Sequence, residues 1–80
     1  MSDNSKIFKQ GLIVEKEGKL KETNVKIKSH YESFEYEYVK NKLHPERHNV
    51  DDLRLLLSNL LTEMDTYKEI YGEIQELIKG

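Results

Sequence analysis

Apolar residues recur at alternating steps of three and four from Val50 to the end of the chain. They are Val50, Leu53, Leu57, Leu60, Met64, Tyr67, Tyr71, Ile74 and Ile78. This heptad spacing is typical of an amphipathic helix. The 29 residues from 50 to 78 would form a helix about 43 Å long. Asn49 is a good N-cap with Asp51 and Asp52 behind it, and Lys79-Gly80 suits a helix end.

The first 43 residues show shorter patterns that favour strands. Residues 7–16 hold an apolar cluster that ends at Glu17-Gly18, a pair typical of turns. Residues 25–31 and 34–38 alternate apolar or aromatic with charged positions, as in half-buried strands. The segment around Pro45 then interrupts the alternation. The pattern therefore predicts an α+β fold: a three-stranded antiparallel meander followed by one long C-terminal α-helix.

The chain is short enough to form one domain, which we expect to span residues 6–80 after a disordered N-terminus at residues 1–5. Its 13 basic and 15 acidic residues leave a net charge of −2, without the basic excess typical of duplex binders and membrane-surface proteins. The start lacks a basic segment followed by an apolar run, so we expect a cytoplasmic protein. Cysteine is absent, which excludes disulfides and thiolate metal sites.

The sharpest catalytic candidate is the segment His44-Pro45-Glu46-Arg47-His48. Zinc proteases place two histidines four residues apart on one helix, whereas Pro45 directly after the first histidine opposes a helix through both. The segment is better explained as a polar connection. We find no glycine-rich phosphate loop and no nucleophile elbow. The sequence predicts no catalytic, metal or cofactor site, no small-molecule substrate and no enzyme.

Lysines and aromatic residues alternate between Lys26 and Tyr38. Sheets that bind single-stranded nucleic acid combine a basic groove with aromatic rings that stack on bases. The aromatic residues of 34–38 share one face, however, and a sheet with one helix must bury a face under it. Nucleic-acid binding is therefore the second hypothesis.

The predicted helix carries further apolar residues beside the heptad positions, namely Leu56, Leu61, Ile70 and Leu77. This apolar surface exceeds what a short meander can cover, and each buried side chain is worth about 1.5–3 kcal/mol. The surplus predicts a protein partner in a homo- or heterodimer or a larger complex. The balanced charge, without a basic excess, predicts no membrane contact.

Residues 50–61 resemble the small dimerisation subunit of the KEOPS tRNA-modification complex, over the C-terminal half of the chain. Leu53-Arg54 matches the family's Leu-Arg, whereas Ser58-Asn59 inverts its Asn-Ser order, and the family's helix between its first two strands has no counterpart in residues 16–26. The resemblance implies a non-catalytic subunit that pairs sheet to sheet with a copy or relative. It also implies docking on the subunit that makes threonylcarbamoyl-adenosine in tRNA.

The leading functional hypothesis is a non-catalytic interaction or dimerisation subunit of a larger assembly. The resemblance suggests KEOPS as that assembly, with this chain as an accessory subunit. The alternatives are a small regulator that binds single-stranded nucleic acid and a viral inhibitor of a host enzyme. The expected interface or core residues are Leu53, Leu57, Leu60, Met64, Tyr67, Tyr71 and Ile74.

Overall fold

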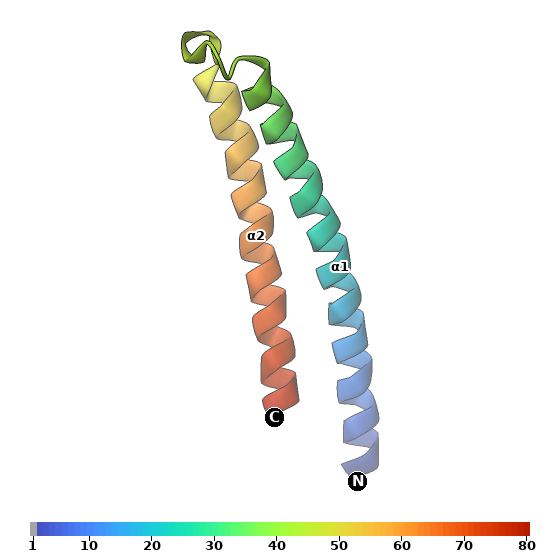
Figure 1. Ribbon diagram of the computed structural model, residues 1–80. Coiled ribbons are helices and arrows are strands. Elements are labelled where there is room, and N and C mark those ends of the chain that lie inside the picture. Colours follow the sequence, from blue (N-terminus) through green and yellow to red (C-terminus); the bar gives the residue numbers. More distant parts are fainter. Residues whose placement is uncertain (1) are drawn as a thin grey trace.

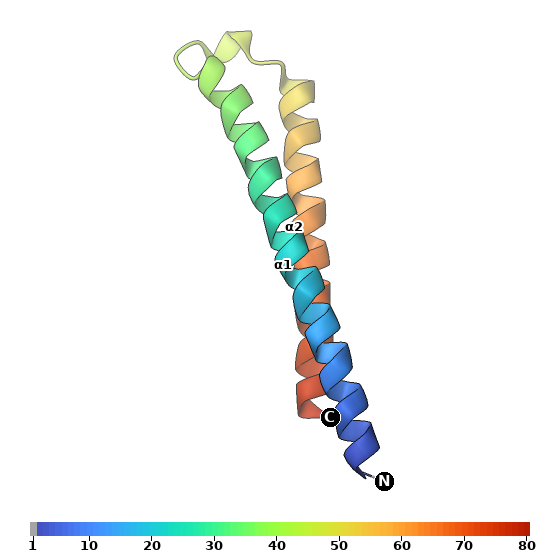
Figure 2. The ribbon, with the colours of Figure 1, turned by 90° about the vertical axis from the view of Figure 1, so that its right-hand side faces the viewer.

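Two long helices form an antiparallel hairpin. The computed structural model describes residues 2–80, with side chains from Ser5 onward, so of residues 1–5, which were expected to be disordered, Met1 lies outside the described part. Helix α1 spans Ser2–Lys40 and helix α2 spans Val50–Lys79, with a short 3₁₀ turn, η1, at Pro45–Arg47 between them. Figure 1 shows both termini at one end and the connection at the other, and Figure 2 shows the helices crossing at a shallow angle. The molecule measures 65 × 15 × 14 Å.

The predicted meander is wrong, because residues 2–80 contain no strand. All three predicted strands lie in α1, and so does the turn predicted at Glu17-Gly18. Gly11 and Gly18 continue the helix without a positive φ. The fold is all-α, with a single layer of two helices.

The segments that favoured strands are short compared with the helix that contains them. Residues 25–31 and 34–38 are too short to separate a period of two from a helical period. Over the whole of α1, apolar residues also recur every seventh position on one side of the helix, at Ile13, Leu20, Ile27 and Phe34. Many of the remaining residues are lysine and glutamate, which favour helix, and proline is absent before Pro45.

Helix α2 lies where the sequence predicted a helix. The Asn49 side-chain oxygen accepts a hydrogen bond from the Asp52 backbone N–H at 3.2 Å. At the other end, the Gly80 N–H donates to the Glu76 carbonyl oxygen at 2.9 Å. Local capping therefore defines both ends of this helix.

We expect Asn49→Ala to lower the free energy of unfolding by about 1 kcal/mol, because an N–H at the start of α2 loses its side-chain acceptor. Asn49→Ser is the matched control, since serine caps equally well. Urea unfolding followed by circular dichroism measures both variants. Equal stability of Asn49→Ala and the wild type would contradict this role of Asn49.

The connection between the helices is held by a histidine that folds back onto α1. The His48 ring stacks on the Tyr38 ring, with centroids 5.2 Å apart. His48 Nε2 donates to the Tyr38 carbonyl oxygen at 2.9 Å. Carbonyl groups in the last turn of a helix lack helical partners, so this bond helps to satisfy the end of α1.

The contact between the helices is thin and partly polar. Along α1, the apolar positions facing α2 alternate with Lys9, Lys16, Thr23, His30 and Glu37. Helix α2 supplies eight facing positions: Leu53, Leu56, Leu60, Glu63, Tyr67, Ile70, Ile74 and Leu77. Among side chains from Ser5 onward, only Ile74 and Thr23 are buried, with 5% and 7% of their surface exposed. The hairpin by itself has almost no core.

Candidate docking surface

The predicted interface residues divide between two sides of α2. Leu53, Leu60 and Tyr67 are half-buried and Ile74 is buried, in the line of positions that faces α1. The other three are exposed, one position further around the helix: Leu57, Met64 and Tyr71. One half of the predicted heptad positions therefore contacts α1, and the other half remains exposed.

The exposed side of this pattern forms a continuous apolar line, which we call the α2 ridge. It consists of Val50, Leu57, Met64, Tyr71 and Ile78, spaced seven residues apart. Between 40% and 61% of the surface of each residue is exposed. The ridge spans the helix for about 42 Å and contains no charged residue. An uncharged apolar line of this length indicates a contact surface.

Helix α1 adds aromatic residues to the same side of the hairpin. Glu17 and Asn24 line a small hollow together with Tyr67, so this side of α1 adjoins the side of α2 that bears Tyr67. Tyr31 and Tyr38 follow Asn24 at steps of seven, and both are exposed. The ridge residues nearest to Tyr67 in sequence, at minus three and plus four, are Met64 and Tyr71. We call the α2 ridge together with Tyr31 and Tyr38 the apolar face.

Charges border the apolar face. On α1, the neighbouring positions carry Lys21, Lys28 and Glu35, and on α2 they carry Arg54 and Lys68. A hydrogen bond to Glu35, together with the negative charge of that carboxylate, raises the pKa of Tyr31. The face therefore has an apolar centre with a charged rim, which is the usual arrangement in protein interfaces.

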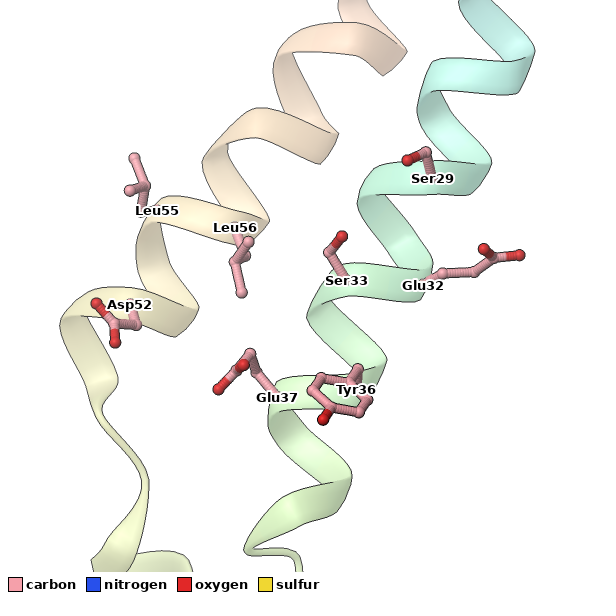
Figure 3. Close-up of a pocket in the computed structure, with 8 residues that line it drawn as sticks. All are labelled: Ser29, Glu32, Ser33, Tyr36, Glu37, Asp52, Leu55 and Leu56. Atoms are coloured by element: carbon pink, nitrogen blue, oxygen red, sulfur yellow. The ribbon is translucent and has the colours of Figure 1, made fainter.

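The opposite side of the hairpin is more polar. Positions 52, 59, 66 and 73 of α2 carry Asp, Asn, Thr and Glu on that side. Exposed Leu55 lies there too and lines an open pocket of about 520 Å³ near the connection. Figure 3 shows Ser33 and Leu56 directed into the gap between the helices, whereas Glu32 points away from α2.

This pocket offers little for catalysis. Glu32, Glu37 and Asp52 bring three carboxylates, and Ser29 and Ser33 bring hydroxyls. No histidine or lysine lines the pocket to act as a base for these hydroxyls. Its open form also leaves water free to enter.

The two histidines of the connection are held separately. His44 Nδ1 lies 3.6 Å from Glu46 Oε1, whereas His48 bonds to the end of α1. Among the side chains that the structure describes, from Ser5 onward, no three histidines or carboxylates are grouped closely enough to hold a metal ion.

Sequence reasoning missed one half of the helix contact. Leu56, Ile70 and Leu77 face α1, although by sequence they were interpreted as surplus apolar residues. Their partners on α1 were assigned to strands. A repeat of seven residues marks the contact positions on both helices. It becomes visible only when the pattern is followed along a whole helix, and not within one predicted strand.

Neither described helix has an apolar stretch long enough to cross a bilayer. No family model, curated protein or solved structure matches the chain.

Proposed function

We propose that this chain is a non-catalytic protein-interaction module that binds a partner protein through its apolar face. The main support is the combination of a long uncharged α2 ridge with a hairpin that buries only two described side chains. Exposed apolar surface of this extent is costly in water, and covering it with protein gains about 25 cal/mol per Å².

Two functions suggested by the sequence, KEOPS membership and base stacking, both depend on a β-sheet. The KEOPS resemblance implies pairing through sheets, and residues 2–80 contain none. The proposal therefore depends on the apolar face, and membership of KEOPS stays a prediction from sequence. Base stacking on a sheet is likewise unsupported, because Lys26, Tyr36 and Tyr38 lie on a helix.

The test uses a photo-crosslinking amino acid placed in the full chain in the cells that produce it. Met64 lies on the α2 ridge, and Asn59 is an exposed position on the opposite side of the same helix. We expect a discrete protein adduct from position 64 and none from position 59. Leu57→Glu should remove the adduct, because it places a charge in the contact. Absence of any adduct from position 64 would contradict the proposed function.

A further inference from the structure

We propose that the partner of the apolar face is a second copy of this chain, so that two hairpins form a four-helix bundle. This inference rests on the proposed function and specifies its partner. Two copies related by a two-fold axis use the same surface twice, so the α2 ridge of each copy is covered by the other. Pairing also supplies the second layer of helices that a stable core requires.

The exposed area of the hairpin is large enough for such a dimer. The chain exposes 6542 Å². A compact monomer of this mass, 9.5 kDa, exposes roughly 5,000 Å². The surplus of roughly 1,500 Å² exceeds the ~800 Å² that each partner buries in a standard interface. An interface of standard size over the apolar face would therefore remove about half of this surplus.

Charge determines which helices meet across the dimer. Residues 6–28 of α1 contain seven lysines and three glutamates, residues 29–40 contain one lysine and three glutamates, and α2 contains three basic and seven acidic residues. Packing α2 against the second copy's α1 brings opposite charges together along residues 6–28, whereas packing α2 against α2 brings two acidic helices together. We therefore place α2 of each copy over α1 of the other, with the two-fold axis along the hairpin.

The register within the hairpin gives the contacts of this arrangement. Lys16 forms an ion pair with Glu73, so Tyr31 lies about level with Leu57, and Tyr38 about level with Val50. With the axis along the hairpin, the same levels apply between copies. Tyr31 of each copy then packs against Leu57 of the other, and Tyr38 packs against Val50. Glu35 comes level with Arg54 of the second copy, as a rim ion pair.

Sedimentation equilibrium of the purified full chain over a wide concentration range tests the dimer. We expect the wild type to be dimeric, with helix content by circular dichroism that falls as dilution separates the copies. Leu57→Glu should raise the dimer dissociation constant about a hundredfold, because two charges enter the contact. Leu55→Glu is the matched control on the opposite side and should change it by less than about threefold.

A second substitution distinguishes two causes of a higher dimer dissociation constant, which are a weaker contact between the copies and a less stable helix. Met64→Ala shortens a ridge side chain but favours helix, so a rise of about tenfold in the dissociation constant cannot come from lower helix propensity. A wild-type chain that stays monomeric at all concentrations would overturn the inference. If position 64 still crosslinks a different protein in cells, the proposed function stands without self-association. If it crosslinks nothing, the proposed function fails as well.

Cysteine pairs test the orientation, because the chain has no cysteine of its own. A mixture of Tyr31→Cys and Leu57→Cys chains should form a disulfide-linked dimer between the two variants on oxidation. Met64→Cys by itself should form none, since the two copies of this residue lie on diagonal helices. Efficient linkage of Met64→Cys would overturn the proposed arrangement in favour of α2 packed against α2.

Discussion

Replacing Ile74 by alanine is expected to lower the free energy of unfolding by about 2–4 kcal/mol. Ile74 has the lowest exposure of any described side chain, at 5%, and lies on α2 in the line that faces α1. Alanine removes most of its apolar surface and leaves a cavity between the helices. Because small domains have only a few kcal/mol of stability, most of the helix signal should be lost at room temperature.

The matched control for this experiment is Leu55→Ala. Leu55 is also an apolar residue of α2, but 62% of its surface is exposed, on the side away from the apolar face. Its replacement should change stability by less than about 0.5 kcal/mol. Both variants are compared with the wild type at one protein concentration, because association contributes to apparent stability. A wild-type unfolding midpoint for Ile74→Ala would contradict the packing of α1 against α2.

Replacing Gly11, Gly18 and Gly72 by alanine together is expected to stabilise the protein by about 1.5–3 kcal/mol. Each glycine lies inside a helix without a positive φ, where alanine is better by about 0.5–1 kcal/mol. No atom lies within 4 Å of the position that a Cβ would take at any of the three. For a chain of this size the thermal midpoint should rise by about 10–20 °C.

Two further substitutions make the glycine experiment decisive. Gly80→Ala is the control, because its Cβ would lie 3.2 Å from the Glu76 carbonyl oxygen, and we expect no gain. Gly18→Ala also separates the helical hairpin from the α+β fold that the sequence pattern predicted. If Gly18 occupied a turn with positive φ, as the sequence suggested, alanine would lower the thermal midpoint. A lower midpoint would thus contradict the continuous helix α1.

The histidine-containing connection illustrates a role that the sequence did not show. By sequence, His48 stood out only as a possible zinc ligand paired with His44. In the structure its ring stacks on Tyr38 and bonds to the carbonyl oxygen of that residue. That contact depends on the end of α1 lying beside the connection.

By itself, the sequence determined helix α2 and the excess of apolar surface. The heptad spacing extends over 29 residues, and the capping groups at Asn49 and Gly80 are local in the chain. Such signals do not depend on distant residues. The same spacing placed Leu57, Met64 and Tyr71 among the expected contact residues, and all three are exposed on the α2 ridge.

Only the tertiary structure decided that α1 is a helix and which side of α2 it covers. The apolar residues of α1 point in many directions, and the line through Ile13, Leu20, Ile27 and Phe34 is interleaved with polar residues. That line becomes an inner face only when α2 lies against it. Most of the stability of a helix in a protein comes from such packing and not from intrinsic propensity. The same placement of α1 leaves the α2 ridge open for a partner.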